Sequence, residues 1–315
     1  MATLNSVLGP LDTSRLGFTL MHEHTVVASA GIPQDYAELF ATNYIDRIAD
    51  GLKRAKEGGV DTIVDATTLD LGRDIRLMAE VSRRSGVNVI AVTGWWLEIP
   101  RMLSGVSADR FARAFIREIR EGIAGTDITA GLIKSASDMS GVTPDGEAVL
   151  RGAARAHLET GVPIMFHSYA PGQVGRQQLA ILKEEGVDLR RVKVDHSNDT
   201  TDVEYLTWLL EQGCYLGLDR YPGSNVSPEA RTRTMKALID AGYEERLLPS
   251  HDWSYAWVIA EASPMPPQAE RERRNPYGYL YLKEVVFPQL REMGVAEATL
   301  NRLCVDNPRR FFEGS

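Results

Sequence analysis

Histidines are few in this chain, and several of the six stand where they could bind metal ions. His22 and His24 form an H-x-H pair, and side chains at i and i+2 of a strand point to the same side. With a carboxylate such as Asp252, two neutral imidazoles make a good ligand set for zinc and similar ions. Ions held in this way activate water, so this pattern indicates metal-dependent hydrolysis.

Two more histidines and one lysine extend this candidate site. His167 and His196 each follow an apolar run, and Lys134 ends another such run. A buried ammonium is costly and tends to become neutral. A neutral amine can react with carbon dioxide to form an anionic carbamate that bridges two ions. The alternative is that Lys134 pairs with Asp65 or Asp138.

Each candidate also has a structural interpretation. His167 and His196 could be core histidines bonded to backbone carbonyls, and Asp252 could cap the segment that follows it. The other two histidines are not expected to be ligands. His157 falls within a predicted helix, and His251 should point away from Asp252 because strand side chains alternate.

Short apolar runs and segments of helical period alternate along the chain. The eight predicted strands are Phe18–Met21, Thr62–Asp65, Val89–Thr93, Thr129–Lys134, Ile164–His167, Arg191–His196, Tyr215–Asp219 and Leu247–Asp252. Between them, apolar residues recur at helical spacing. The predicted helices are Ile45–Glu57, Ile75–Ser85, Phe111–Gly122, Glu147–Thr160, Gly175–Glu185, Val203–Gln212 and Glu229–Ala241.

Eightfold alternation of strand and helix predicts a (β/α)8 barrel, a TIM barrel, in which residues 1–315 form one domain. A doubly wound open sheet is the alternative, but no G-x-G-x-x-G motif follows the first strand. In a barrel the catalytic groups stand at the C-terminal ends of the strands. The six candidate ligands all fall at such ends, which favours one shared site.

Composition excludes several classes of function. A net charge of −8 argues against a nucleic-acid partner. The sequence shows no secretory signal and no membrane-spanning run, so we expect a soluble, cytoplasmic protein. Cys214 and Cys304 fit no metal motif, and reduced thiols are the simpler interpretation. Arg271, Arg273 and Arg274 are interpreted as solvated loop residues.

The stretch Trp253–Pro276 has no clear periodicity and follows the last predicted strand. A loop of this length in a compact domain is usually functional, so we expect a lid or a binding loop. A disordered surface insert is the alternative.

As an ordered set, these segments resemble the phosphotriesterase family of the amidohydrolase superfamily, including its phosphotriesterase-like lactonases. The resemblance runs nearly end to end. Each segment alone is a modest match, whereas the set in this order is highly specific. The matching segments are Leu20–His24, Gly131–Lys134, Ile164–His167, Val194–His196, Leu218–Arg220, Ser250–Asp252 and Asp306–Phe312, the last as a closing helix.

The resemblance implies two divalent metal ions, with zinc expected and cobalt, iron or manganese as alternatives. His22, His24 and Asp252 would hold the more buried ion, and His167 and His196 the more exposed one. N6-carboxylated Lys134 and a hydroxide would bridge the two ions. The hydroxide would attack the substrate, and Asp252 would accept or relay the proton.

Some positions depart from the lactonases of the family and bear on the substrate. Trp96 occupies the position of a tyrosine at the end of the third strand, and an indole donates but cannot accept a hydrogen bond. Arg220 fits the lactonase-like branch, in which an arginine organises the pocket. Trp253, Tyr255 and Trp257 suggest an aromatic wall beside the site, with loop packing as the alternative. The segment Asn275–Tyr277 is also unlike that branch.

Three functions follow from these patterns. The first is an ester hydrolase, lactonase-like, with some organophosphate triesterase activity on small molecules. The second is a family member that cleaves another ester, an amide or a phosphodiester. The third is a metal-containing barrel that binds a ligand without turnover, against which the complete ligand set argues. Family members are commonly homodimers, although no segment here marks an interface.

Overall fold

The computed structural model describes residues 2–39, 43–257 and 268–314, and an eight-stranded parallel sheet forms its centre. The strand order is β10-β9-β8-β7-β6-β5-β4-β3, so neighbours in the sequence are neighbours in the sheet. The strands are β3 (Thr19–Glu23), β4 (Thr62–Asp65), β5 (Asn88–Gly94), β6 (Leu132–Ser137), β7 (Ile164–Ser168), β8 (Val192–Val194), β9 (Tyr215–Leu218) and β10 (Leu247–Pro249).

Backbone hydrogen bonds bring the first strand of this sheet against the segment that follows the last. Asp252 N donates to His22 O at 3.1 Å, and His24 N donates to Trp253 O at 2.8 Å. The sheet is therefore nearly closed on itself, and the barrel prediction is confirmed.

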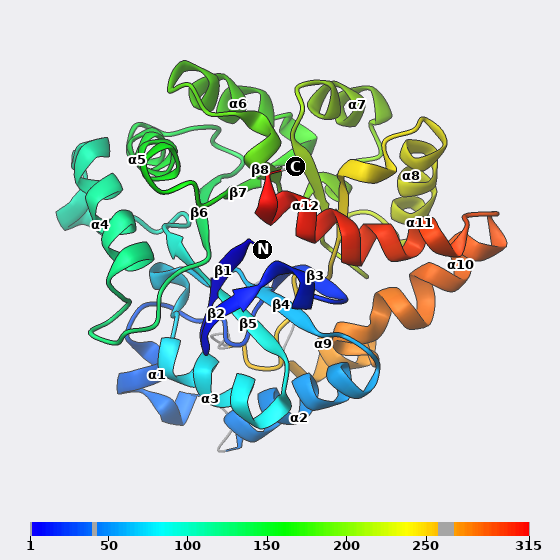
Figure 1. Ribbon diagram of the computed structural model, residues 1–315, viewed down its shortest axis with the longest axis horizontal. Helices are drawn as coiled ribbons and strands as arrows, with labels where there is room; N and C mark the ends of the chain where they lie inside the picture. Colours follow the sequence, from blue (N-terminus) through cyan, green and yellow to red (C-terminus); the bar gives the residue numbers. More distant parts are fainter. Residues whose placement is uncertain (1, 40–42, 258–267, 315) are drawn as a thin grey trace.

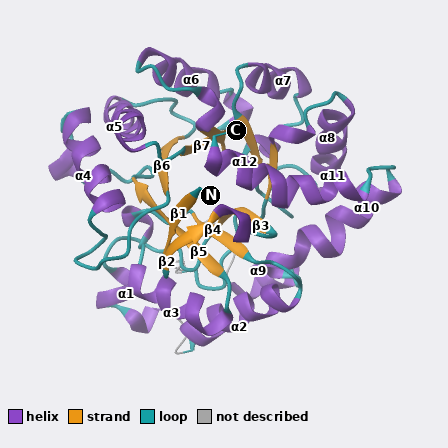
Figure 2. Ribbon diagram, viewed as in Figure 1, coloured by secondary structure: helices purple, strands orange, loops and turns teal. Residues whose placement is uncertain are grey.

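A ring of helices surrounds the sheet (Figures 1 and 2). One helix follows each of the strands β3 to β9: α2 (Tyr44–Glu57), α3 (Ile75–Ser85), α4 (Ala108–Arg120), α5 (Pro144–Thr160), α6 (Gly175–Glu184), α7 (Val203–Glu211) and α8 (Pro228–Asp240). In α4 the buried residues Phe111, Phe115 and Ile119 recur every four positions, which turns one face towards the sheet. These helices match the predicted ones within a few residues.

The opposite end of the barrel from the candidate site is covered by elements that the periodicity did not predict. An antiparallel hairpin of β1 (Thr3–Ser6) and β2 (Gly9–Asp12) lies across this end, and Figure 1 looks onto it. Leu11, Phe311 and Phe312 pack there against apolar residues of the barrel interior. The C-terminal helices are α10 (Phe287–Glu292), α11 (Glu297–Asn301) and α12 (Asn307–Glu313), the last as the family resemblance implied.

β9 ends one residue earlier than predicted, and two other strands end earlier still, each shortly before a candidate site residue. β8 ends at Val194 and β10 at Pro249. His196 has φ 60° and Asp252 has φ 54°, a left-handed backbone that a strand cannot contain. Such strained residues collect at functional sites. Conversely, β6 continues to Ser137, so Lys134 lies inside its strand rather than at its end.

The prediction of a structureless loop over Trp253–Pro276 is wrong in part, because α9 (Gln268–Arg274) lies within it. A short helix, α1 (Ile32–Asp35), also occupies the loop after β3. Residues 258–267 lie outside the described part of the chain, so the expected lid there is untested. Arg273 and Arg274 are exposed, but Arg271 is half-buried, which corrects its assignment as a solvated residue.

No helix among the described residues combines the length and apolar character that crossing a membrane requires.

Cys214 and Cys304 are both free and buried, as expected for reduced thiols. Burial raises the pKa of Cys214 to about 12 and raises that of Cys304 as well. Because the thiolate is the reactive form, we expect neither thiol to react with a disulfide reagent at about pH 8 in the folded protein. Both should react in guanidinium chloride without added reductant. A thiol that reacts rapidly in the folded state, or the absence of thiols after denaturation, would contradict this.

Candidate metal centre

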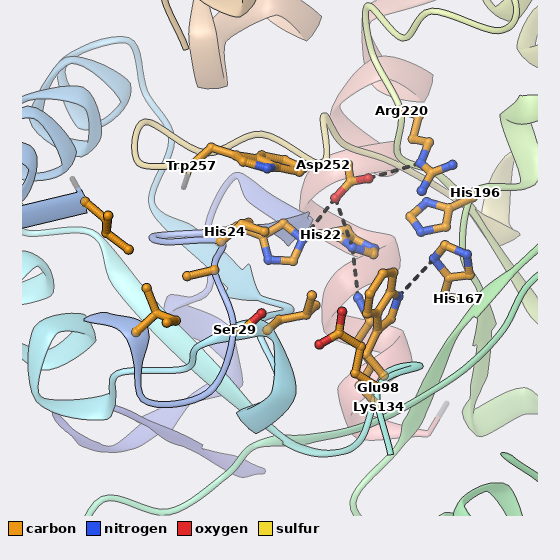
Figure 3. Close-up of a pocket in the computed structure, with 16 residues that line it drawn as sticks. His22, His24, Ser29, Glu98, Lys134, His167, His196, Arg220, Asp252 and Trp257 are labelled. Atoms are coloured by element: carbon orange, nitrogen blue, oxygen red, sulfur yellow. Dashed lines mark hydrogen bonds and ion pairs between the residues drawn. The ribbon is translucent and has the colours of Figure 1, made fainter. Parts of the chain in front are cut away.

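The structure brings all six predicted ligands together, five of them at or just beyond the C-terminal ends of the strands and Lys134 within β6. They line a cavity of about 420 Å³ with Trp96, Arg220 and Trp257, and Figure 3 shows their side chains converging. The cavity wall also includes Ser29 and Glu98, which the sequence analysis did not single out. Whether the six residues bind metal remains a prediction.

His22, His24 and Asp252 meet where β3 lies beside the segment after β10. Asp252 Oδ1 is 2.9 Å from His24 Nε2 and 3.5 Å from His22 Nε2. On its other side, His24 Nδ1 lies 2.8 Å from the Thr67 hydroxyl, which donates to the Val26 carbonyl. The hydroxyl oxygen therefore accepts from His24 Nδ1, which leaves Nε2 facing Asp252.

Lys134 is buried beside these residues, and its Nζ lies 3.1 Å from His22 Nε2. Neither alternative partner pairs with it. Asp65 accepts the backbone N–H groups of Thr25 and Thr67, and Asp138 lies 3.5 Å from a histidine of the site. Burial lowers the pKa of Lys134, which favours the neutral amine that carboxylation requires.

His167 and His196 lie side by side, with ring centroids 4.4 Å apart. His196 Nδ1 is 2.9 Å from Asp219 Oδ1, and His167 Nδ1 is 3.4 Å from the indole nitrogen of Trp96. The expected alternative, a bond from each ring to a backbone carbonyl, is not found among the described contacts. Burial lowers the pKa of His167 and sets that of His196 well below its usual value, so both rings are neutral near pH 7.

The two remaining histidines support the fold and lie away from this cluster. His251 Nδ1 is 2.7 Å from Glu23 Oε1, and His251 Nε2 accepts the backbone N–H of Leu282. His157 Nδ1 lies 2.8 Å from the Val162 carbonyl. Both Glu23 and His251 therefore lie away from the candidate ligands, as predicted, although strand alternation explains this only for Glu23, because β10 ends before His251.

A buried ion network that the sequence analysis missed lies beneath the histidines. Lys193 Nζ is 2.5 Å from Asp195 Oδ1 and 3.2 Å from Asp219 Oδ2, and all three residues are fully buried. Gly217 makes room for the network, because a Cβ there would lie 2.2 Å from Asp219 Oδ2. The signal was present in the sequence: charged residues at i and i+2 of an apolar strand share the barrel interior.

This network orients two candidate ligands. His22 Nδ1 lies 3.2 Å from Asp195 Oδ2 and 3.3 Å from Asp219 Oδ2, and His196 Nδ1 also faces Asp219. Carboxylates at Nδ1 leave Nε2 free for a metal ion. His22, Asp195 and Asp219 have metal-like spacing themselves, but the Lys193 ammonium already supplies the cation between the two carboxylates.

The second group with metal-like spacing is His22, His196 and Asp252, whose ligand atoms lie within 4.8 Å of one another. Burial opposes ionisation of Asp252, but the nearby imidazoles and Arg220 hold its pKa well below the usual range. Arg220 Nε lies 3.0 Å from Asp252 Oδ2, and its Nη1 lies 2.5 Å from Asp199. Asp252 is therefore an ionised carboxylate held beside the imidazole rings of His22 and His196, a donor set that fits divalent cations.

The predicted aromatic wall is only partly correct. Trp257 lines the metal cavity. Tyr255 packs instead against Tyr279, with ring centroids 5.2 Å apart, in the core behind it. Trp253 lines a separate cavity next to the first.

Gly94 allows the backbone before Trp96 to pass close to β6. At its φ of 111°, a Cβ would lie 1.8 Å from the Lys134 carbonyl oxygen.

Replacing Lys193 with methionine tests the network. The change leaves two buried carboxylates without their cation, so the free energy of unfolding should fall by about 3–5 kcal/mol, and metal affinity should fall with it. Urea denaturation and metal titration measure the two effects. The exposed Lys183→Met on α6 is the matched control and should change stability by less than about 0.5 kcal/mol.

A double variant, Lys193→Met with Asp195→Asn, removes one of the unpaired charges and should recover part of the loss. Equal stability of Lys193→Met and Lys183→Met would show that the network contributes nothing.

Comparison with known proteins assigns the chain to a family. The model of the phosphotriesterase family matches residues 2–312. A phosphotriesterase homology protein of Mycobacterium tuberculosis is 38% identical over 99% of this chain and 98% of its own length. An aryldialkylphosphatase of Saccharolobus solfataricus is 37% identical, covering 96% of each chain. The N-acetyltaurine hydrolase of Rattus norvegicus is 24% identical, over 98% of this chain and 97% of its own. The chain belongs to the phosphotriesterase family.

Proposed function

We propose that this protein is a binuclear metal-dependent hydrolase of ester bonds, lactonase-like and with organophosphate triesterase activity. The observation that carries the proposal is the convergence of four imidazoles, one carboxylate and one buried lysine on one cavity. We also infer that residues 1–315 act as one barrel domain, since β3 to β10 form one sheet and the family match spans it.

The donor set suits two divalent ions, with zinc the expected metal. His22, His24 and Asp252 would hold one ion, and His167 and His196 the other. Lys134, carboxylated on Nζ, would supply the bridging oxygens. Its low pKa and burial support this assignment, because a neutral amine reacts with carbon dioxide and an ammonium does not.

When bound, the metal pair would polarise the scissile carbonyl or phosphoryl group and lower the pKa of a water molecule. The protein supplies the handling of the proton. Asp252 is ionised and can accept a proton from the attacking water. Arg220 fixes the orientation of Asp252 through the 3.0 Å contact to Oδ2 and ties it to Asp199.

The relatives suggest two kinds of substrate bond. One relative is named an aryldialkylphosphatase, in agreement with phosphotriester cleavage. Others are named N-acetyltaurine hydrolases, which keeps amide hydrolysis as the second candidate. A screen of metal-loaded protein should therefore compare γ- and δ-lactones, acyl-homoserine lactones, paraoxon, aryl esters and N-acyl amides, with chelated protein as control.

Substitution of the metal-binding candidates tests the chemistry. Asp252→Asn should lower kcat by roughly 10²–10⁴-fold, because it removes the proton acceptor and a ligand. Lys134→Ala should reduce the bound metal below about two ions per chain, measured by elemental analysis. Asp240→Asn and Lys183→Ala, both on the surface, are the matched controls. Unchanged rates in Asp252→Asn or Lys134→Ala would contradict the mechanism.

Trp96→Tyr tests the contribution of the third-strand position to substrate choice. A tyrosine hydroxyl both donates and accepts, so it can orient a lactone in ways that an indole cannot. We expect the ratio of lactonase to aryl esterase kcat/KM to rise while metal content stays constant. Trp208→Tyr on α7 is the control. If Trp96→Tyr changes no substrate, this side chain does not take part in recognition.

A further inference from the structure

A second cavity, of about 520 Å³, adjoins the metal cavity, and we call it the arginine cavity. The two share Arg220, Asp252 and Trp257 in their walls. In Figure 3 these three side chains lie in a row along one edge of the metal cavity. The two cavities therefore adjoin along this edge, and a group bound in the arginine cavity lies next to a substrate at the candidate metal centre.

The arginine cavity carries more positive than negative charge. Its described lining includes two carboxylates, those of Asp199 and Asp252. Against these stand four guanidinium groups, which belong to Arg220, Arg231, Arg271 and Arg274. In a protein with a net charge of −8, this local excess is opposite in sign to the whole molecule. It favours an anionic ligand.

Three of the four guanidinium groups already have anionic partners. Arg220 contacts both Asp252 and Asp199. Arg231 contacts Asp199 at 2.8 Å and donates to two backbone carbonyls. Arg274 lies 2.8 Å from Glu270 on the same helix. These three residues line the cavity, and nearby carboxylates largely offset their positive charge.

Arg271 is different, because no hydrogen bond or ion pair joins its guanidinium group to a side chain or backbone atom of another described residue. Its guanidinium lies over Trp257, 3.9 Å from the ring centroid, and 5.2 Å from that of Trp253. Its Nε is buried without an acceptor, as is the indole nitrogen of Trp253. Stacking on indole rings fixes the guanidinium plane while its N–H groups stay available.

We propose that the arginine cavity binds an anionic group of the substrate, a carboxylate or a phosphate monoester, with Arg271 as its main ligand. This inference rests on the proposed function, because it places the cleaved ester at the metal centre and the anion remote from it. The planar guanidinium fork matches both anions in a bidentate manner. Asn275 Oδ1 in the same wall lacks a donor, so a hydroxyl on the substrate beside the anion would also be accommodated.

Matched pairs of substrates test the proposal. One pair is a γ-lactone with a carboxylate side chain and its neutral carboxamide. The other is a hydroxymethyl lactone with and without a phosphate on the hydroxyl. In the wild type, kcat/KM should be about 10–100-fold higher for the anionic member of at least one pair, mainly through a lower KM, as expected for a charged hydrogen bond. The responding pair identifies the anion.

Arg271→Gln should lower the ratio of kcat/KM for the anionic member to kcat/KM for the neutral member by at least about tenfold. The kcat/KM for the neutral member should stay within about twofold of the wild-type value. Arg271→Lys should retain part of the preference for the anionic member. Arg273→Gln is the matched control, because Arg273 lies on the same short helix but is exposed. A wild-type preference for the neutral members, or an equal loss on both members in Arg271→Gln, would overturn the proposal.

A binding measurement separates this proposal from the proposed function. Calorimetry on metal-loaded protein would follow acetate and inorganic phosphate as probes, without any turnover. Arg271→Gln should raise the Kd of at least one probe by about tenfold. Equal Kd values for wild type and Arg271→Gln with both probes would overturn the anion site. Absence of ester hydrolysis with the Kd difference intact would overturn only the proposed reaction.

Discussion

The carboxylates of Asp195 and Asp219 lie inside the barrel without access to solvent, and the ammonium of Lys193 makes their burial tolerable. Uncompensated charges in such a position would cost several kcal/mol each. Once neutralised, the same carboxylates face Nδ1 of His22 and His196 and fix how these rings are turned. The geometry of the candidate metal centre therefore depends on an ion network whose members never reach the cavity.

Asp252 connects the closure of the barrel to the chemistry of the site. Its backbone N–H bonds to His22 O and helps to bring the last strand against the first. Its side chain meets His24 on one side and Arg220 on the other. Asp252 has a left-handed backbone, lies beyond the end of β10, and lines the cavity with its carboxylate. Asp252 therefore contributes to barrel closure through its backbone and to the candidate site through its side chain.

Two adjoining cavities with different linings make up the candidate site. Arg220, Asp252 and Trp257 lie between the cavity of candidate metal ligands and the cavity rich in guanidinium groups. The first is suited to breaking a bond, and the second to recognising what lies at a distance from that bond. Family membership concerns the first cavity, whereas substrate choice depends on residues such as Arg271 in the segment after β10.

The sequence alone determined the barrel, its helices and the six candidate ligands, because hydrophobic period and strand-end position are local properties of the chain. It also separated Glu23 from the ligands, since alternation along β3 is local too, whereas His251 lies beyond the end of β10. Only the tertiary structure decided that Lys134 pairs with neither Asp65 nor Asp138, that Lys193 neutralises Asp195 and Asp219, and that Arg271 stacks on Trp257. Most of these contacts join residues far apart in the chain, and the spacing of Lys193 and Asp195, which places both on one side of a strand, does not show that Asp219 joins them. The hairpin β1–β2 was not predicted for the same reason, because its apolar residues are buried only by packing against the end of the barrel.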